Sequence, residues 1–235
     1  GNLEDITQRA LRILAEVDLI AAEDTRHTLK LLNHFGIKRR TLSYHQHNER
    51  ERSKEIIAML LSGLNVALVS DAGMPGISDP GNFLVAEAIK QGVKVIPIPG
   101  ASAVVTALAA SGLSTNSFWF QGFLPRKAKE RTEVLTELAK MKGTLVFYEA
   151  PHRLVATLKS ILEIFGDRNT VIARELTKIH EEFIRGRLSE VIAHFENHSP
   201  KGEITILIEG TVVGENRQNS TNINNSNIGV IDETA

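Results

Sequence analysis

Cysteine is absent from this chain of 235 residues. Its absence excludes disulfides, thiolate metal sites and a cysteine nucleophile, and it favours a cytoplasmic setting. Long hydrophobic runs are also missing. None approaches the roughly 18 residues that a bilayer-spanning helix needs, and the chain does not open with a basic segment followed by an apolar one. These absences disfavour membrane and secretory roles, and we expect no contact with a membrane.

Neither sign of charge is in excess, because 27 Lys and Arg residues stand against 28 Asp and Glu residues, a formal net charge of -1. No overall positive field is therefore available to hold nucleic acid. Local basic clusters occur at 38–40, 50–54 and 126–131. Most clusters of this kind are solvated surface, although they could also contact phosphates.

Several familiar functional signatures do not occur. The chain has no phosphate loop of the GxxxxGKS or GxxxxGKT type and no GxGxxG turn, which weakens kinase and dehydrogenase hypotheses. Its 8 histidines show no HExxH spacing, so no metal site is expected. A GxSxG turn is missing as well, which leaves a hydrolase triad without support.

The residues that are present predict an ordinary globular α/β protein. Hydrophobic residues make up 42% and charged residues 23%, and the length allows one large domain or two small ones. In the first half, apolar strand-like runs alternate with helical patterns. The runs lie at 17–24, 42–45, 65–70 and 93–98, and the helical patterns at 3–14, 29–35, 49–61, 83–90 and 101–110. This alternation predicts a doubly wound parallel sheet.

A second α/β unit follows a polar linker at 111–117. Strands are predicted at 118–123, 144–150, 170–175, 183–188 and 203–210, and helices at 127–141, 152–164 and 189–195. We therefore predict an N-terminal α/β domain over 1–112 and a C-terminal α/β domain over 117–210. The Asn-rich segment 211–235 is predicted to be a disordered tail.

Ligands of open parallel sheets bind beyond the carboxyl ends of the strands. Five unusual segments follow predicted strands here, at 22–26, 70–81, 97–103, 147–153 and 173–178. In 70–81, glycines permit positive φ and prolines stiffen the turn, while Asp71 and Asp79 could accept hydrogen bonds from ribose hydroxyls or an ammonium group. An equal alternative for Asp79 is that it caps the next helix, with Pro80 at the first helical position.

The segment 97–103 runs from a predicted strand into a helix of small residues. Backbone N–H groups at the start of that helix could bind a carboxylate or a ribose. The small side chains could equally serve to pack the helix against the sheet. The residues of the two segments alone go no further than a rigid, acidic ligand site.

Nine motifs, taken in order, resemble those of the ribosomal RNA small subunit methyltransferase I family. They are GNLEDIT, AEDTR, SYHQHNE, VSDAGMPGISDPG, PIPGASA, GFLP, FYEAPHR, ARELTK and KGE, and the resemblance covers Gly1 to about Gly210. It implies two α/β domains of the tetrapyrrole methylase type, with a mainly parallel first sheet and a mixed second sheet. It also implies that S-adenosylmethionine is held between the domains and methylates the 2′-hydroxyl of a cytidine ribose in small-subunit ribosomal RNA.

Two departures from the family pattern accompany this resemblance. Family members carry a strand immediately before the Gly-Asn pair that stands here at Gly1 and Asn2, so the first strand is expected to be absent from the N-terminal domain. The Asn-rich tail replaces the small helical extension of many members. A homodimer, and recognition of the ribosomal RNA or of the assembled small subunit, are further expectations from the resemblance.

The resemblance also implies which residues hold the cofactor. They are Asp71, Gly73, Met74, Ile77, Ser78, Asp79, Gly100, Ala101, Ser102, Ala103, Tyr148, Arg174 and Glu203. Because a ribose hydroxyl is a weak acid, a nearby base or a cation that stabilises the oxyanion would assist methyl transfer. The candidate bases are Glu149, His152 and Glu175, and the candidate cations are Arg26, Arg153 and Arg174.

RNA phosphates could be bound by basic residues in two regions, namely Arg26, Arg126, Lys127, Lys129, Arg131 and Arg153. Tyr148 or Trp119 could stack on a base, although Trp119 and Phe120 are better interpreted as core residues of an apolar strand. Two alternatives stay open: a methyltransferase of the same fold acting on a tetrapyrrole or another small molecule, and a non-catalytic form that binds RNA or the subunit. Aromatic residues make up only 5% of the chain, which modestly favours RNA over a tetrapyrrole.

Overall fold

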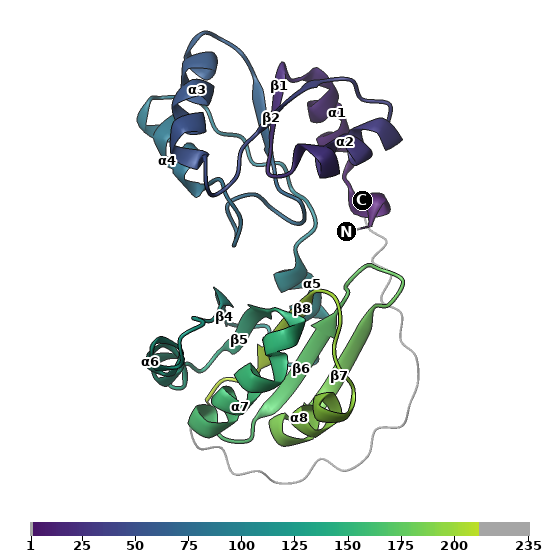
Figure 1. The fold of residues 1–235 in the computed structure, drawn as a ribbon, viewed down its shortest axis with the longest axis vertical. Helices are drawn as coiled ribbons and strands as arrows, with labels where there is room; N and C mark the ends of the chain where they lie inside the picture. Colours follow the sequence, from purple (N-terminus) through teal and green to yellow (C-terminus); the bar gives the residue numbers. More distant parts are fainter. Residues whose placement is uncertain (1, 212–235) are drawn as a thin grey trace.

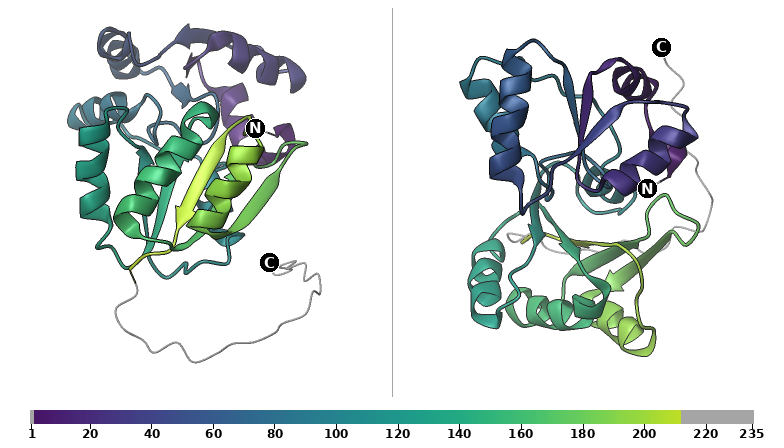
Figure 2. Two further views of the ribbon diagram at one scale, coloured as in Figure 1. Left: turned by 60° about the horizontal axis from the view of Figure 1, so that its bottom comes forward. Right: turned by 45° about the horizontal axis from the view of Figure 1, so that its top comes forward.

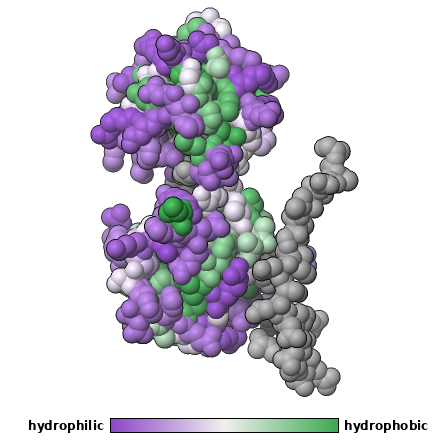
Figure 3. Space-filling model, turned by 90° about the vertical axis from the view of Figure 1, so that its right-hand side faces the viewer, coloured by the Kyte–Doolittle hydropathy of each residue, from purple (hydrophilic) through white to green (hydrophobic). Residues whose placement is uncertain are grey.

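Residues 2–211 are described by the structure, a computed structural model in which the chain forms two lobes, each built around one sheet (Figure 1). Seen from the side, a constriction separates the lobes, and apolar patches are visible on both (Figure 3). Apart from Thr211, the predicted disordered tail lies outside the described residues. Within residues 2–211, no helix is both long enough and apolar enough to cross a membrane.

The first lobe holds a three-stranded parallel sheet in the order β2-β1-β3. Its strands are β1 (Leu19–Ala22), β2 (Arg40–Ser43) and β3 (Val66–Val69), and its helices are η1 (Leu3–Asp5), α1 (Gln8–Glu16), α2 (Thr25–His34), α3 (Glu49–Leu61) and α4 (Asn82–Lys90). Residues of β1 alternate between two cores. Ile20 packs with Leu14 of α1 and Leu32 of α2, whereas Ala21 packs with Ile56 of α3 and Leu84 of α4. Helices therefore cover both faces of the sheet, as the predicted doubly wound arrangement requires.

The strand predicted at 93–98 does not form, so this prediction is wrong. In the structure this segment makes no ladder, and β3 pairs only with β1 among the described strands. An apolar run becomes a strand only where a neighbouring strand accepts its backbone hydrogen bonds. Beside β3 lies instead a cavity of about 400 Å³, lined by α1, β3 and residues 98–101 among others, and Val95 and Ile96 are left 42% and 53% exposed.

The second lobe holds a five-stranded mixed sheet in the order β4-β5-β8-β6-β7. The strands are β4 (Phe118–Phe123), β5 (Thr144–Glu149), β6 (Asn169–Arg174), β7 (Glu182–Arg187) and β8 (Ile204–Ile208). Only β4 and β5 are parallel, and the other neighbours are antiparallel. The parallel first sheet and mixed second sheet confirm the predicted α/β class.

Helices cover the two faces of the second sheet unequally. Three helices, α6 (Ala128–Leu138), α7 (Leu154–Phe165) and α8 (Leu188–Asn197), pack on one face, with the short η2 (Pro151–Arg153) before α7 (Figure 2). The opposite face is covered by α5 (Ala103–Ala109), whose Val104, Ala107 and Leu108 contact apolar residues of β5, β6 and β8. By packing, α5 belongs with the second sheet, while the division of the sequence at 112 and 117 stays a prediction.

Trp119 does not lie in the core, contrary to the interpretation from the sequence. It is 48% exposed, and its indole Nε1 donates a hydrogen bond to Oε1 of Gln121 at 3.2 Å. The reason is the strand order, which places β4 at the edge of the sheet with one side uncovered. Phe120, which points to the other face, is half-buried with its ring 4.9 Å from that of Tyr148.

Candidate functional site

The loop 70–81 joins β3 to α4 and reaches the second lobe. Its Ser78 has a φ of 61°, and a Cβ built on Gly122 of β4 would lie 2.9 Å from the Ser78 hydroxyl oxygen. Gly81 closes the loop with a φ of 140°, and a Cβ there would lie 2.8 Å from a methyl carbon of Leu68. Glycine suits both positions, because their φ values of 140° at Gly81 and 73° at Gly122 strain other residues.

Asp79 does not cap α4, so the alternative derived from the sequence is wrong. The helix begins at Asn82, its N-cap residue is Gly81, and no side chain makes a capping hydrogen bond. The Asp79 carboxyl group lies instead among other acidic groups from both lobes. Burial, then the charge of Glu23, and also Asp71 and Glu203, raise its pKa to about 6.

Tyr148 at the end of β5 lies near Asp79, and we call the region between loop 70–81 and Tyr148 and Glu203 of the second lobe the cleft. Burial, followed by the charges of Asp79 and Glu203, raises the pKa of its phenol. Its ring contacts Phe120 and Phe123 at centroid distances of 4.9 and 5.7 Å. Carboxylates of the first lobe thus act on the same region as Glu203 of the second, and their field favours a cationic ligand.

Asp71 connects the ends of two parallel strands of the first lobe. Its Oδ1 accepts a hydrogen bond from the backbone N–H of Asp24 at 3.2 Å, and its own N–H donates to the Glu23 carboxylate at 3.3 Å. Its second oxygen is 3.9 Å from Nδ1 of His27. Glu23 was not singled out from the sequence, although it directly follows β1 and Asp71 stands two residues after β3.

Residues 100–103 form the wall opposite the loop. A Cβ on Gly100 would lie 3.6 Å from the Met74 sulfur, and one on Gly73 would lie 3.7 Å from the carbonyl oxygen of Ala101. Ser102 is the N-cap residue of α5, which starts at Ala103 and shows no side-chain cap. Ile77, at the tip of the loop, is 51% exposed. The predicted segments 70–81 and 97–103 therefore do meet.

Glu149 lies away from this cleft, which corrects its predicted role as a base there. Its side chain is fully buried beneath α7. One oxygen accepts a hydrogen bond from the Thr157 hydroxyl at 2.6 Å, and the other accepts one from the Ala150 N–H at 2.8 Å and lies 3.4 Å from Nε of Arg153. Both oxygens are already engaged, so neither is available to a substrate.

Glu175 is also engaged in holding the structure. With a φ of 51°, it accepts hydrogen bonds from Lys178 Nζ at 2.8 Å and from the Glu203 N–H at 2.9 Å. The bond from Lys178, followed by that from the Glu203 N–H, lowers the pKa of its carboxyl group. A carboxylate with a lowered pKa is a poor proton acceptor, which argues against Glu175 as a base, while its catalytic role stays a prediction.

The predicted cations lie in three separate places. Arg174 pairs with Glu182 at 2.8 Å and donates to the Lys201 carbonyl at 3.2 Å, near the start of β8. Arg26 pairs with Asp24 at 2.8 Å, and its side chain is 87% exposed on the first lobe. The hydrogen bond from Arg26 holds the pKa of Asp24 well below its usual range. Arg153 lies with neither of them.

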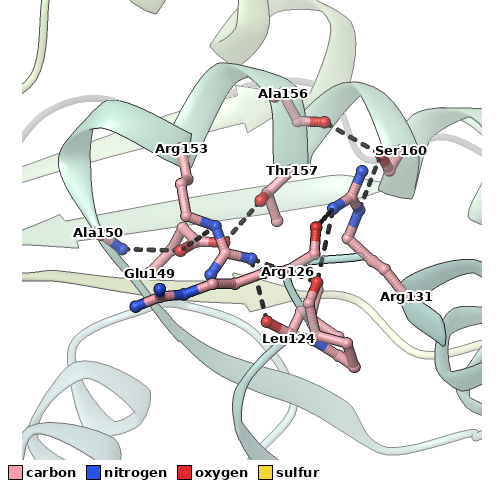
Figure 4. A network of polar contacts seen from close by, with 10 residues as sticks. Leu124, Arg126, Arg131, Glu149, Ala150, Arg153, Ala156, Thr157 and Ser160 are labelled. Carbon is pink, nitrogen blue, oxygen red and sulfur yellow. Dashed lines mark hydrogen bonds and ion pairs between the residues drawn. The ribbon is translucent and has the colours of Figure 1, made fainter. Parts of the chain in front are cut away.

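A pocket on the α7 face brings Arg153 together with other predicted residues (Figure 4). Its volume is about 370 Å³, and it is lined by Arg126, Arg131, His152, Arg153, Ala156 and Thr157. Lys127 and Lys129 do not line it; Lys127 pairs with Glu130 at 3.0 Å, and Lys129 is exposed on α6. We call this site the arginine pocket. His152, predicted as a base for the cleft, belongs to it.

Two other features concern titratable groups that the sequence interpretation did not assign. His45, which follows β2, has a buried Nδ1 without a hydrogen-bond partner within residues 2–211. In the same part of the chain, no group of three or more His, Asp or Glu side chains has an arrangement suited to a metal ion. His45 lies in the SYHQHNE motif, which is the signal that could have drawn attention to it.

Comparison with known proteins identifies similar chains over most of the length. The family model for Tetrapyrrole (Corrin/Porphyrin) Methylases matches residues 1–192. Ribosomal RNA small subunit methyltransferase I of Halalkalibacterium halodurans is 57% identical over 210 residues, which are 89% of this chain and 73% of that protein. The protein of the same description from Thermotoga maritima is 54% identical over 210 residues, which are 89% of this chain and 94% of that one.

Solved structures share the fold at lower sequence identity. A cobalt precorrin-4 methyltransferase of cobalamin biosynthesis aligns with a TM-score of 0.65 and 19% identity, covering 89% of this chain and 90% of that one. The uroporphyrin-III C-methyl transferase of Thermus thermophilus, complexed with S-adenyl homocysteine, aligns with a TM-score of 0.60 and 22% identity, covering 88% and 92%. These likenesses establish the fold of the two lobes.

Proposed function

The chain belongs to the tetrapyrrole methylase family and, within it, to the ribosomal RNA small subunit methyltransferase I family, and we propose that it transfers a methyl group from S-adenosylmethionine to ribosomal RNA. Identity above 50% to two relatives of that description supports the RNA substrate. One structural observation carries the proposal: Asp71, Gly73 and Met74 of loop 70–81 line one cavity of about 400 Å³ together with Gly100 and Ala101, and the carboxyl group of Glu203 lies near Asp79 of that loop.

The residues of the cleft fit this cofactor. S-adenosylmethionine carries a sulfonium and an ammonium group, and the carboxylates around Asp79 supply the negative field that such a cation complements. Asp71 exposes a carboxylate oxygen that can accept hydrogen bonds from ribose hydroxyls. Gly73 and Gly100 leave room for the backbone to approach a ligand closely. When bound, the cofactor supplies an electrophilic methyl group on a positively charged leaving group.

The finer proposal is that the acceptor is the 2′-hydroxyl of a cytidine ribose in small-subunit ribosomal RNA. Its support is the ordered set of nine motifs in the sequence. Because the leaving group is already positive, holding the hydroxyl in line with the methyl group can provide much of the acceleration. Tyr148, whose pKa is raised, stays protonated at neutral pH, so its hydroxyl can donate a hydrogen bond in the cleft.

The remaining predicted properties belong to the same proposal. We propose that the assembled small subunit or its RNA is the partner, that the enzyme acts in the cytoplasm, and that it forms a homodimer. The cofactor residues of the proposal are Asp71, Gly73, Met74, Ile77, Ser78, Asp79, Gly100, Ala101, Ser102, Ala103, Tyr148, Arg174 and Glu203. Of these, Asp71, Gly73, Met74, Gly100 and Ala101 line one cavity.

Radiolabelled methyl transfer tests the function. The full chain is incubated with S-adenosylmethionine labelled in the methyl group and with one of three acceptors: purified small-subunit ribosomal RNA, assembled small subunits or uroporphyrinogen III. Labelled RNA is then digested to nucleosides. We expect label in RNA, recovered as 2′-O-methylcytidine.

Other outcomes overturn the proposal in distinguishable ways. Label only in the tetrapyrrole would assign the enzyme to small-molecule methylation. Label in RNA at another nucleoside would retain RNA methylation but refute the cytidine ribose. A folded chain that binds RNA but shows no calorimetric heat and no thermal shift with S-adenosylmethionine would be the non-catalytic form.

A further inference from the structure

The arginine pocket is assembled from two segments that are distant in the sequence. The turn between β4 and α6 carries Arg126, the first turns of α6 carry Arg131, and the region where η2 passes into α7 carries His152 and Arg153. Figure 4 shows the side chains of Arg126, Arg131 and Arg153 around the turn at Leu124. A cavity of about 370 Å³ remains between these segments.

Two of the arginines are held in place by neutral acceptors. Nε of Arg131 donates to the Ser160 hydroxyl at 3.2 Å, and its Nη1 donates to the Arg126 carbonyl at the same distance. Nη2 of Arg153 donates to the carbonyl of Leu124 at 3.0 Å. Because their side chains are already ordered, a ligand would bind without a large loss of side-chain entropy.

The positive charge of the pocket is not neutralised by protein groups. Three guanidinium groups line the pocket, and the one ion pair among them joins Nε of Arg153 to the buried Glu149 carboxylate at 3.4 Å, so positive charge is in excess. Within residues 2–211, neither Arg126 nor Arg131 has a carboxylate at ion-pair distance. Bringing several like charges together in a partly enclosed site is unfavourable unless an anion binds between them.

Guanidinium groups are suited to particular anions. Their planar forks form paired hydrogen bonds with phosphate and carboxylate oxygens. Arg126 donates no hydrogen bond to another described residue, and Arg131 leaves Nη2 without a protein acceptor in the same range. These donors remain available to a ligand that carries more than one oxygen.

The position of the pocket connects it to the cleft. Both lie at the end of β5, where Tyr148 faces the cleft and Glu149 faces the arginine pocket. A polymer that passes over this edge of the second sheet would meet both sites. We propose that Arg126, Arg131 and Arg153 bind one phosphodiester of the RNA backbone and thereby position the RNA relative to the cleft. The inference rests on the proposed function, because it takes RNA as the substrate.

Salt-dependent RNA binding tests the inference with matched variants of the full chain. Arg126→Gln removes a charge of the pocket without breaking a hydrogen bond of the described structure, and Lys140→Gln removes a charge from an exposed residue two positions beyond the end of α6. The affinity for small-subunit ribosomal RNA is measured over a series of KCl concentrations, together with the affinity for S-adenosylmethionine and the melting temperature.

We expect Arg126→Gln to weaken RNA binding about tenfold at moderate salt and to reduce the slope of log K against log[KCl] by about 0.7 to 1, the change for one lost phosphate contact. Lys140→Gln is expected to leave both values unchanged. Cofactor affinity and melting temperature should stay at the wild-type level in both variants, since neither side chain contacts the cleft.

An unchanged affinity and slope in Arg126→Gln would overturn the inference, and so would an equal loss in Lys140→Gln. Thermal stabilisation by inorganic phosphate that depends on Arg126, without any effect on RNA binding, would assign the pocket to a free anion and also overturn it. A wild-type chain with Arg126-dependent RNA binding but no methyl transfer would refute the proposed function alone. Methyl transfer with Arg126-independent RNA binding would refute this inference alone.

Discussion

Tyr148 and Glu149 are adjacent in the chain but point to opposite faces of the second sheet. Tyr148 packs with Phe120 and Phe123 and is influenced by the charge of Asp79 from the other lobe, whereas Glu149 is buried beneath α7 with Thr157 and Arg153. The alternation of side chains along a strand thus divides one sequence motif, FYEAPHR, between two sites. Tyr148 faces the cleft, whereas His152 and Arg153 line the arginine pocket and Glu149 lies buried beside it.

Glu149→Gln is expected to destabilise the fold while retaining methyl transfer. The substitution removes the buried carboxylate beside the arginine pocket, leaving a half-buried Arg153 without its counter-charge. We expect the free energy of unfolding to fall by about 1 to 3 kcal/mol, measured by urea denaturation. Glu163→Gln, an exposed change on α7, the helix that covers Glu149, should stay within about 0.5 kcal/mol of wild type. Loss of methyl transfer at full stability would restore Glu149 as a candidate base.

The stability of the ligand-free chain should depend on pH through Asp79. The pKa of this group is about 6 in the folded chain, above the ordinary value of 3.8, so protonation favours the folded state. Its contribution is fully present below pH 4 and is lost as the pH rises through 6. Asp79→Asn should therefore be more stable than wild type above pH 6 and differ little near pH 4, by urea denaturation across this range. A constant difference between the two chains would contradict the assignment.

Cofactor affinity should show the opposite trend with pH. A cationic ligand binds best when Asp79 is ionised, so binding of S-adenosylmethionine releases a proton from this group at low pH. We expect the affinity to increase as the pH rises from 5 to 7, by up to about tenfold per unit below the pKa. Calorimetry should show this dependence in wild type and its disappearance in Asp79→Asn. A pH profile shared by both chains would exclude Asp79 as its source.

Substitutions of Asp71 can separate charge from loop structure. Asn keeps an oxygen that can accept the hydrogen bond from the Asp24 N–H, while Ala removes it. We expect Asp71→Asn to weaken cofactor binding about tenfold, the effect of roughly 1.4 kcal/mol for a lost charge-assisted hydrogen bond, with little change in stability. Asp71→Ala should also lower the free energy of unfolding by about 1 kcal/mol. Equal cofactor affinity in wild type and Asp71→Asn would remove Asp71 from the site.

Gly202→Ala tests the connection between Glu175 and the last strand. Gly202 has a φ of 83°, and a Cβ there would overlap the Glu175 carboxyl group. We expect a loss of about 2 to 4 kcal/mol, because backbone strain and steric overlap add. Gly92→Ala is the matched control, since its φ is 74° with no atom within 4 Å of the added Cβ, and it should lose only about 1 kcal/mol. Equal losses would show that the overlap is relieved at no cost.

Errors of the sequence interpretation have identifiable physical causes. The apolar run 93–98 has the composition of a strand, but β3 does not pair with it, and a strand exists only as part of a ladder. Trp119 has the composition of a core residue, but its strand lies at the edge of the sheet. Both outcomes depend on which strands become neighbours, a property that local patterns do not contain.

The candidate site, too, could be predicted from the sequence only in part. Gly73, Gly76, Gly81, Asp71 and Asp79 could be assigned to a ligand loop from the sequence, because positive φ requires glycine and loops after parallel strands meet at one edge of a sheet. The sequence could not separate the cap from the site for Asp79. The start of α4 at Asn82 decides this, since it leaves the carboxyl group free to face the cleft.

By itself, the sequence determined the α/β class, most of the strands and helices, and the segments from which the cleft is built. Local periodicity, glycine conformations and strand ends are properties of neighbouring residues, so they can be recognised in one dimension. Only the tertiary structure decided that His152 and Arg153 join Arg126 and Arg131 in a separate pocket, and that the charges of Glu23 and Glu203 act on Asp79. Those groupings bring together charges from distant segments, and their energies depend on distances in space.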